Sequence, residues 1–425
     1  MITLPYPPIK FNVGFVSTRF AGTDGVSLET EKWAEVLNEF GHHCYYFAGE
    51  CDRSPEISMV VPEAHYRHPE IAERHHHFFG NEIRAKEDTL WIHEKTVDLK
   101  EKLYEFEDRF QIEVLIPENV LAIPLHIPLG LAITEFIAET HIPTIAHHHD
   151  FSWERKRFLV NNIWDYLSMA FPPTLHAIQH VTINSSARHQ LARRKGVVSA
   201  IIPNVMHFEK PAPGIDDFNA DLREVLGISK DQLFVLQPTR VVQRKGIEHA
   251  IELISRLERD AVLVISHASG DEGYEYEERL REYAAMIGVP TIFASERFDE
   301  NRGKLADGRK VYSLWDAYPH ADLVTYPSLI EGFGNAFLEA VYFRKPIVVN
   351  NYTIYNIDIR TKGFQVIEFD DYITEETVRT TQRVLDNPNE IARMTDHNYG
   401  LALKYFSYHV LKSRLGDLLD NLVWA

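Results

Sequence analysis

Apolar runs and amphipathic stretches alternate along the chain. NVGFVS at 12–17 and CYYFAG at 44–49 are short, mostly apolar runs of the kind that forms buried strands. Between them lies an apolar stripe with the spacing of one helix face, at Trp33, Val36, Leu37 and Phe40. Ser27 is the predicted N-cap of this helix, and Gly41 ends it. A strand, a loop, a helix and a second strand in this order are typical of a parallel sheet.

The same alternation continues to the C-terminus. More strands of the first half are predicted at 113–116, at 143–146 and near 181–185, and a helix near 129–139. Residues 203–222 are rich in proline and lack periodicity, which indicates a linker. A second series follows with the strands LFVLQ, AVLVIS, DLVTYP and PIVVN, and the tail is mostly helical. We therefore predict two doubly wound α/β domains, with ligands beyond the carboxyl ends of the strands and in an interdomain cleft.

Composition narrows the class of protein. With 425 residues the chain is too long for one ordinary core, and its formal net charge is −18. That charge argues against a nucleic-acid partner and against simple docking on anionic lipid. Two cysteines, Cys44 and Cys51, form no disulfide framework, so a reducing, cytoplasmic compartment is expected. No signal peptide and no transmembrane helix are predicted, because no uninterrupted apolar span of ~20 residues is present.

Residues 65–105 stand out by their content of charge and histidine. We predict an insertion in the first domain there, with the run His75, His76 and His77 in a loop. Such a segment shapes either an acceptor pocket or an oligomer contact, so a homo-oligomer stays open.

The stretch SLIEGFGNAFLEA at 328–340 places two carboxylates, Glu331 and Glu339, around a Gly-Phe-Gly turn. It follows a predicted strand, so Glu331 lies in a loop and Glu339 more than a turn inside the next helix. This separation argues against a metal pair or a shared-proton dyad and favours two separate hydroxyl-binding groups. The glycines let a ligand approach the backbone, and the N–H groups after them open a helix, which suits an anion. The alternative is a solvated helix glutamate beside a plain turn.

Two cations, Arg240 and Lys245, follow the strand LFVLQ. Arginine grips two oxygens at once and lysine acts as a point charge, so the pair suits a diphosphate. A solvated charge run would contain the same residue types. The position on the same predicted sheet as the Gly-Phe-Gly turn favours the ligand-binding interpretation.

Together these residues resemble retaining glycosyltransferase family 4, which contains phosphatidylinositol mannosyltransferases, sucrose synthases and sucrose-phosphate synthases. The most specific match is YPHADLVTYPSLIEGFGNAFLEAVYFRKPIVV, supported by IPTIAHHHD, VTINSSARHQL, IIPN and KYFSYHVLKSRLGDLL. The resemblance implies the GT-B fold, in which two Rossmann-like domains, here 1–203 and 204–405, face a cleft. It also implies a C-terminal helix, here 406–425, that crosses back to the first domain.

The resemblance assigns roles in the second domain. Arg240 and Lys245 would bind the donor diphosphate, and Glu339 would hold the ribose hydroxyls. Glu331 would contact the donor sugar. Backbone N–H groups would be supplied by Gly332, Phe333, Gly334 and Asn335.

In the first domain His149 fits the family histidine near the reacting sugar, and Gly25 would lie beside the donor phosphate or the acceptor. Acceptor-side candidates are His126, which follows a strand end, and Trp153 and Arg155, which follow the histidine run. Trp153 could stack on a sugar and Arg155 could bind an anionic group, or both could be ordinary wall residues.

Three positions depart from the family pattern. Asp24-Gly25 stands where a Gly-Gly pair is common, Thr239 where a glycine usually precedes the arginine, and Phe343-Arg344 where small residues are usual. The first departure leaves the phosphate and acceptor contacts of the first domain open.

The resemblance implies transfer of a hexose from a UDP- or GDP-linked sugar to an acceptor hydroxyl with retention at the anomeric carbon. His149, Arg240, Lys245 and Glu331 would carry the reaction, with no metal and no other cofactor. The acidic composition favours a small soluble or saccharide acceptor. Alternatives are a sugar phosphorylase or nucleotide-sugar epimerase on the same fold, and a sugar-nucleotide sensor without turnover.

Overall fold

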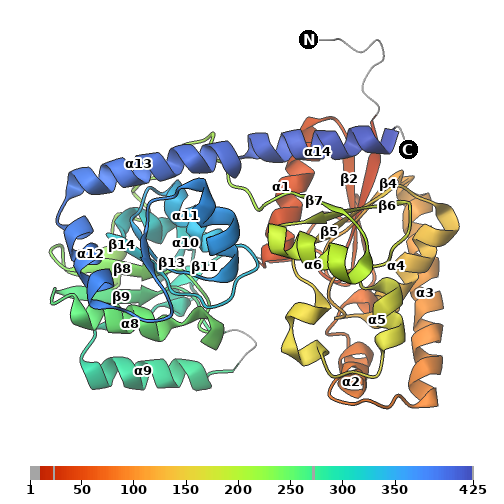
Figure 1. Cartoon of the computed structure of the whole chain (residues 1–425), viewed down its shortest axis with the longest axis horizontal. Helices are drawn as coiled ribbons and strands as arrows, with labels where there is room; N and C mark the ends of the chain where they lie inside the picture. Colours follow the sequence, from red (N-terminus) through yellow and green to blue (C-terminus); the bar gives the residue numbers. More distant parts are fainter. Residues whose placement is uncertain (1–9, 23, 270–272, 424–425) are drawn as a thin grey trace, which may run out of the picture. The chain divides into compact units, whose positions relative to one another are not determined.

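The computed structural model describes residues 10–22, 24–269 and 273–423 (Figure 1). The chain folds into two compact units. The first unit combines the residues up to Pro203 with those from Leu411 onward, and the second spans Asn204–Val410. The sequence-based boundaries were 1–203, 204–405 and 406–425. Each unit is described by itself below.

The first unit is built on a seven-stranded sheet in the order β3-β2-β1-β4-β5-β6-β7, with all neighbours parallel. Its strands are β1 (Asn12–Val16), β2 (His43–Ala48), β3 (Ser58–Val60), β4 (Val114–Pro117), β5 (Thr144–His148), β6 (Ile178–Thr182) and β7 (Ser199–Ile201). Its helices are α1 (Gly25–Glu39), α2 (Pro69–Phe78), α3 (Lys86–Phe110), α4 (Ile127–Thr140), α5 (Trp164–Ala170), α6 (Ser185–Lys195) and most of α14 (Tyr408–Val423). Short 3-10 turns lie at Pro62–Ala64, Ser152–Glu154 and Lys156–Phe158.

The second unit has a six-stranded parallel sheet in the order β10-β9-β8-β14-β15-β16. Its strands are β8 (Leu233–Gln237), β9 (Ala261–Ile265), β10 (Thr291–Phe293), β14 (Leu323–Tyr326), β15 (Ile347–Asn350) and β16 (Ile367–Phe369). A small sheet adds β11 (Phe298–Asp299), β12 (Gly303–Lys304) and β13 (Lys310–Ser313). The helices are α7 (Leu222–Val225), α8 (Ile247–Arg256), α9 (Glu275–Ile287), α10 (Leu314–Ala317), α11 (Asn335–Tyr342), α12 (Glu375–Leu385) and α13 (Pro388–Tyr405).

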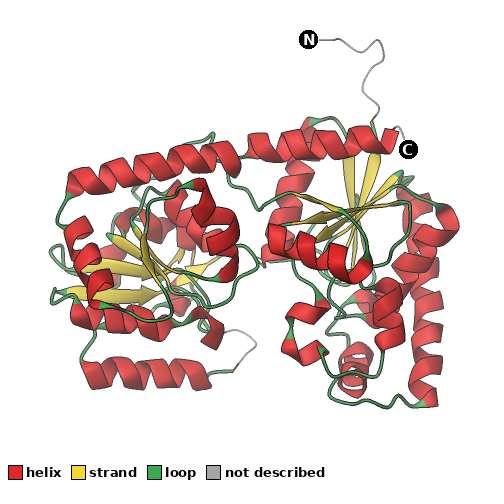
Figure 2. Cartoon of the chain, in the orientation of Figure 1, coloured by secondary structure: helices red, strands yellow, loops and turns green. Residues whose placement is uncertain are grey.

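Helices cover both faces of each main sheet, as Figure 2 shows. The predicted doubly wound α/β architecture is therefore confirmed in both halves of the chain. The order of strands reverses direction between β1 and β4 in the first unit and between β8 and β14 in the second. Ligands of such sheets bind outside the carboxyl ends of the strands at these switch points.

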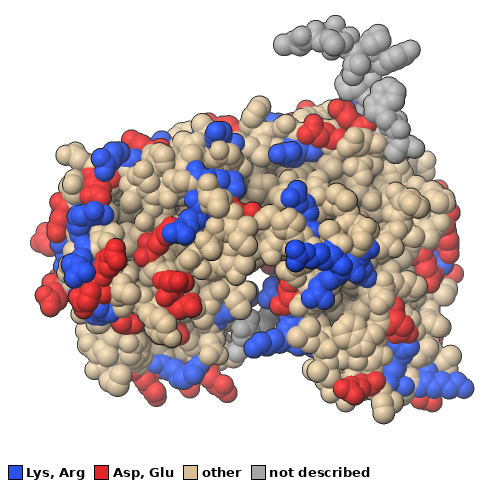
Figure 3. Space-filling model, in the orientation of Figure 1, with Lys and Arg blue, Asp and Glu red and all other residues tan. Residues whose placement is uncertain are grey.

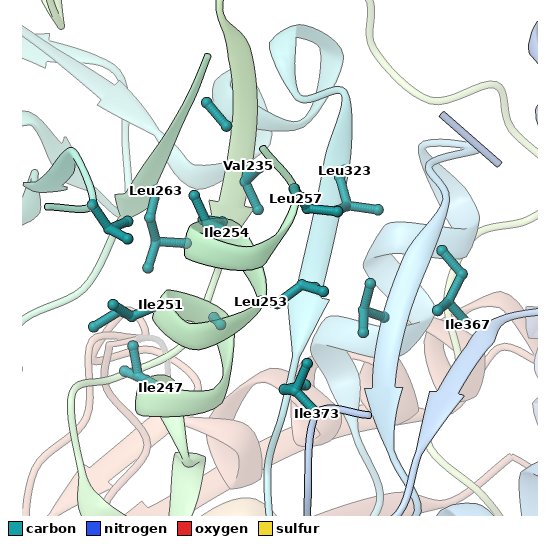
Figure 4. Packing of buried hydrophobic residues seen from close by; sticks show 14 of the residues in the cluster. Val235, Ile247, Ile251, Leu253, Ile254, Leu257, Leu263, Leu323, Ile367 and Ile373 are labelled. Atoms are coloured by element: carbon teal, nitrogen blue, oxygen red, sulfur yellow. The ribbon is translucent and has the colours of Figure 1, made fainter. Parts of the chain in front are cut away.

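The core of the second unit shows how the sequence pattern becomes packing. One face of α8 presents Ile247, Ile251 and Ile254, all buried, toward Val235 of β8 and Leu263 of β9 (Figure 4). The three isoleucines repeat at i, i+4 and i+7, the spacing of one helix face. Burial of each of these side chains contributes about 1.5–3 kcal/mol relative to exposure. The strands are apolar on both faces because helices cover both.

The structure corrects three local predictions. The N-cap of α1 is Asp24 and not Ser27, since Asp24 Oδ1 accepts the N–H of Val26 at 3.0 Å. Residues 75–77 lie in the helix α2 and not in a loop. Much of the predicted insertion at 65–105 is no insertion, because α3 buries Leu99 and Leu103 in the core of the first unit. The core role of α3 was not predicted from the sequence, because charged residues outnumber the buried apolar residues along this helix.

Among the described residues, no helix combines the length and the apolar character that crossing a membrane requires.

Two helical glycines predict opposite responses to the same substitution. In α4, a Cβ at Gly130 would come within 2.3 Å of the Phe171 ring, whereas a Cβ at Gly400 in α13 would meet nothing within 4 Å. We expect Gly130→Ala to destabilise the protein by about 1–3 kcal/mol through overpacking. Gly400→Ala should stabilise it by roughly 0.5–1 kcal/mol, because alanine loses less backbone entropy in a helix. Calorimetric unfolding of both variants measures the two signs, and equal effects would contradict the packing seen around Gly130.

Candidate functional site

The switch point of the second unit is formed by two loops that hold each other. One follows β8 and contains Lys245, and the other follows β14 and contains Glu331. The N–H of Leu329 donates to the carbonyl of Arg244 at 2.9 Å. A Cβ at Gly246, whose φ is +58°, would approach the carbonyl oxygen of Pro327 to 2.7 Å. Glycine at 246 is thus required both by its backbone conformation and by the closeness of the second loop.

Lys245 and Glu331 form an ion pair in a site where both side chains are only about one-tenth exposed. The Arg244 guanidinium lies 3.4 Å from the same carboxylate. Burial alone would raise the pKa of Glu331, but the Lys245 and Arg244 cations outweigh it and hold that pKa below its usual value. Glu331 is therefore an ionised acceptor, fixed in place before any ligand arrives.

The turn after Glu331 is shaped by tyrosines. Gly334 has a φ of +127°, and a Cβ there would lie 2.4 Å from the Tyr352 hydroxyl. That hydroxyl donates to the carbonyl of Phe333 at 2.8 Å. The Phe333 ring itself is buried edge-on against Phe406, so only its backbone is available to a ligand. The result is a rigid turn that opens α11 with N–H groups at its start, where a helix attracts anions.

Glu339 and Asn335 lie on α11 itself. The hydroxyl of the buried Tyr318 donates to Glu339 Oε2 at 2.7 Å. The amide of Asn204, far away in sequence, donates to Asn335 Oδ1 at 2.7 Å. Glu339 is partly exposed and lies five residues into the sequence of α11, so the two carboxylates of the motif occupy separate places, as predicted.

Arg240 differs from its neighbours because it is exposed and its guanidinium forms no hydrogen bond or ion pair with another described residue. His267, directly beyond β9, was not singled out from the sequence. Burial first, and then the cations Arg240 and Lys245, lower the pKa of His267 to about 4. A neutral imidazole thus lies beside two cations at the same sheet edge. The sequence does contain one sign of His267: it is a polar residue just after the carboxyl end of a predicted strand, where ligands of such sheets bind.

The first unit gathers polar groups at its own switch point. Glu118 follows β4 and is fully buried, and His147 of β5 donates from Nδ1 to Glu118 Oε2 at 2.9 Å. His149 Nε2 lies 3.4 Å from the same oxygen. Burial raises the pKa of Glu118 to about 7, and the hydrogen bond from His149 opposes that rise. Burial also lowers the pKa of His147 to about 3 and lowers that of His149, so both rings stay neutral near pH 7.

Comparison with known proteins decides the family. A profile described as "Glycosyl transferases group 1" matches residues 218–400. The chain is 30% identical to the mannosylglucosylglycerate synthase of Thermotoga maritima, over 94% of this chain and 96% of that protein. It is 32% identical to the mannosylglucosylglycerate synthase of Petrotoga mobilis, over 96% and 97% of the two chains. The crystal structure of a glycosyltransferase from Rickettsia africae superposes with a TM-score of 0.70 at 12% identity, covering 97% of this chain and 99% of that one.

The chain belongs to the group 1 glycosyltransferases. This is family 4, the family of retaining enzymes that the sequence motifs indicated, and the GT-B fold is likewise confirmed. The glycosyltransferase therefore catalyses sugar transfer. At the two switch points it holds the residues that the resemblance named, with Lys245 and Glu331 in one unit and His149 in the other.

One predicted acceptor residue of the glycosyltransferase is corrected. His126 is buried, with a side chain that caps α4: its Nδ1 accepts the N–H of Leu129 at 3.1 Å. Its Nε2 donates to the carbonyl of Glu63 at 2.8 Å. With both ring nitrogens bound to backbone, His126 shapes the fold and does not line a pocket. The sequence placed it correctly after a strand, but could not show that its ring turns inward.

The other first-unit candidates have mixed surroundings. Trp153 stacks on Phe151 with ring centroids 4.5 Å apart, and the guanidinium of Arg194 lies 5.3 Å from its ring centre. The Trp153 ring thus packs against Phe151 and Arg194, which leaves little of it for stacking on a sugar. Arg155 is exposed and pairs with Asp150, next to His149. Gly25 is exposed at the start of α1, with open space where a Cβ would be.

We expect Lys245→Ala and Glu331→Ala each to lower the rate of sugar transfer by at least ~100-fold, because each removes a group that the resemblance assigns to the donor site and leaves a buried charge without its partner. Initial rates with a nucleotide sugar measure the loss, and circular dichroism checks the fold. Arg259→Ala is the matched control, since it removes a surface ion pair with Asp386 in the same unit and should change the rate less than twofold. Turnover like that of the wild type in either site variant would remove that residue from the mechanism.

The buried carboxyl of Glu118 predicts a pH-dependent stability. Its pKa rises from 4.5 to about 7 on folding, so its contribution to stability is present below pH 4.5 and is lost as the pH rises to 7. The change is about 3 kcal/mol. We expect the unfolding free energy of Glu118→Gln, minus that of the wild type, to increase as the pH rises from 4.5 to 7, because glutamine does not titrate. Denaturant titration at several pH values measures this difference. A difference that does not vary with pH would show that Glu118 is ionised with an ordinary pKa.

Proposed function

We propose that the enzyme transfers a mannosyl group from a nucleoside diphosphate mannose to glucosylglycerate, giving mannosylglucosylglycerate. The observation that carries this proposal is the similarity to two mannosylglucosylglycerate synthases, at 30% and 32% identity over more than nine-tenths of the chain. The similarity extends over both units, including the first unit, where the resemblance to family 4 puts the acceptor.

The proposed binding of a nucleotide-sugar donor is supported by the charges of the second unit's site. Leaving-group departure puts negative charge on the diphosphate, and the site offers Arg240, Lys245 and the start of α11 to stabilise it. The ionised Glu331 can accept hydrogen bonds from sugar hydroxyls through an oxygen that Lys245 has already positioned. Glu339 remains the group for the ribose. These protein charges support transfer without a metal ion, with the nucleotide being UDP or GDP.

The acceptor half rests on the carboxylate that glucosylglycerate carries. The chain as a whole is acidic, with a net charge of −18, yet cations gather on part of the first unit. Arg155, Lys156 and Arg157 are exposed a few residues after the histidine run. Figure 3 shows a further group of Lys and Arg over α6, where Arg193 and Arg194 are exposed. A local excess of cations favours an anionic sugar acceptor.

The reaction is a substitution at the anomeric carbon. The bond from that carbon to the diphosphate oxygen breaks, the bond to the acceptor oxygen forms on the same face, and the configuration is retained. The acceptor proton passes to the leaving phosphate oxygen, so no protein nucleophile is required. Glu331 and Glu339 then serve as binding groups and not as the acid and base of a glycosidase.

The test combines four donors with two acceptors. GDP-mannose, UDP-mannose, GDP-glucose and UDP-glucose are each incubated with glucosylglycerate and with glucosylglycerol, its neutral analogue without the carboxylate. We expect product from one mannosyl donor with glucosylglycerate, a retained linkage by NMR, and a kcat/KM at least ~10-fold lower with the neutral acceptor. A chelator should change the rate less than twofold.

Three results would contradict the proposal. Equal use of both acceptors would remove the carboxylate from recognition. Product from a glucosyl donor only would change the sugar. Sugar phosphate formed from inorganic phosphate would identify a phosphorylase.

A further inference from the structure

Glu118, His147 and His149 form a cluster in the first unit, and the family resemblance assigns a role only to His149. One carboxylate oxygen of Glu118 and one ring nitrogen of each histidine lie within 4.8 Å of one another. Glu118 and His147 are paired across the ends of the neighbouring strands β4 and β5. His149 lies one residue beyond the end of β5 and two residues after His147, and both rings reach the same Glu118 oxygen. His148 points to the opposite side, where its Nε2 lies 2.9 Å from His180 Nδ1.

The hydrogen bonds of the cluster indicate which ring nitrogen of each histidine carries the proton. Glu118 Oε2 is within reach of His147 Nδ1 at 2.9 Å and of His149 Nε2 at 3.4 Å. At pH 8, above the raised pKa of about 7, Glu118 is a carboxylate that only accepts, so each of these nitrogens carries the proton. His147 Nε2 is then bare, which agrees with its burial without a hydrogen-bond partner among the described residues. By the same reasoning His149 holds its proton on Nε2 and has a bare Nδ1.

The surroundings fix this arrangement. Trp33 of α1 stacks on His147 with centroids 4.2 Å apart and an angle of 22° between the rings. Asn119 Oδ1 accepts the N–H of His149 at 3.0 Å, while its amide donates to Asp150 Oδ1 at 3.0 Å. The side chain of His149 is 11% exposed, whereas those of His147 and Glu118 are almost completely buried. Of the three groups, His149 is therefore the one that can meet a ligand.

We propose that Glu118 is a positioning residue that holds His149 in the Nε2-protonated tautomer and presents its bare Nδ1 to a ligand hydroxyl. This inference rests on the proposed function, because it takes His149 as the residue beside the reacting sugar. A histidine so held accepts a hydrogen bond from the substrate and donates none. Glu118 itself touches no substrate and acts only through His149.

A metal ion is the competing interpretation of the same three side chains. Metal-bound imidazoles almost always donate their second ring N–H to a carboxylate, a carbonyl or water. His147 Nε2 lacks such a partner among the described residues. The stacked Trp33 and the direct hydrogen bonds to Glu118 fit a carboxylate–imidazole network better.

The experiment reads the tautomer directly. The full-length enzyme is labelled with ¹⁵N-histidine, and long-range ¹H–¹⁵N spectra at pH 8 identify which ring nitrogen of His149 is protonated; a His149→Asn spectrum assigns the signal. We expect an Nε2-protonated ring in the wild type and a mixture of tautomers in Glu118→Gln. Transfer by Glu118→Gln should fall at least ~10-fold in kcat, with a KM for the donor within about threefold of the wild-type value.

His180→Asn is the matched control. It removes the partner of His148, on the other face of the same strand, and should leave the tautomer of His149 unchanged. The proposal is overturned if His149 of the wild type is protonated on Nδ1, or if Glu118→Gln keeps both the tautomer and kcat. Stoichiometric Zn²⁺ binding that shifts both His147 and His149 would replace it with a metal site. Because the tautomer is read without substrate, failure of the proposed acceptor leaves this result standing.

Discussion

Parallel strands can be joined only by crossovers, and in each unit these crossovers first build the sheet outward on one side of the initial strand and then on the other. The helices that follow the two central strands therefore pack on opposite faces of the sheet, and the sheet edge between them stays uncovered. This single constraint fixes where each unit can hold a ligand. In the second unit it brings the loop of Lys245 against the loop of Glu331. In the first it places Glu118 beside β5 and its histidines.

Both switch points hold buried carboxylates, and the two are stabilised in different ways. Glu331 lies against two cations, which favour its charged form and keep its pKa low. Among the described residues, the hydrogen-bond donors to the Glu118 side chain are neutral imidazoles, so burial dominates and its pKa rises to about 7. A carboxylate held in its charged form by cations suits the proposed donor site, which would bind sugar hydroxyls and a diphosphate. A carboxylate held by imidazoles is suited to orienting those rings.

Rigid surroundings support both sites. Tyr318 and Tyr352 hold the α11 motif from within the second unit through hydrogen bonds to Glu339 and to the backbone of Phe333. Trp33 holds His147 in the first unit by stacking. None of these aromatic residues has to contact a substrate, yet each limits the positions that a binding residue can adopt. Pre-positioned groups of this kind lose little entropy when a ligand binds.

The sequence by itself determined the fold class and indicated the residues that we propose for the donor site. Apolar runs bounded by glycine and proline mark strands, and their alternation with amphipathic helices is strong enough to predict two doubly wound sheets. Motifs such as the Glu331–Glu339 stretch are contiguous, so local order places them at a strand end without further information. The family and its chemistry follow from the same local features.

Only the tertiary structure decided which polar residues meet. Glu118 and His147 are 29 positions apart, and nothing in either local sequence states that their strands are neighbours. The three histidines at 147–149 look alike in sequence, but alternation along β5 gives His148 to one face and its neighbours to the other. His126 has the position expected of a ligand residue, yet its ring caps a helix. Side-chain direction and long-range pairing depend on strand order, which periodicity does not contain.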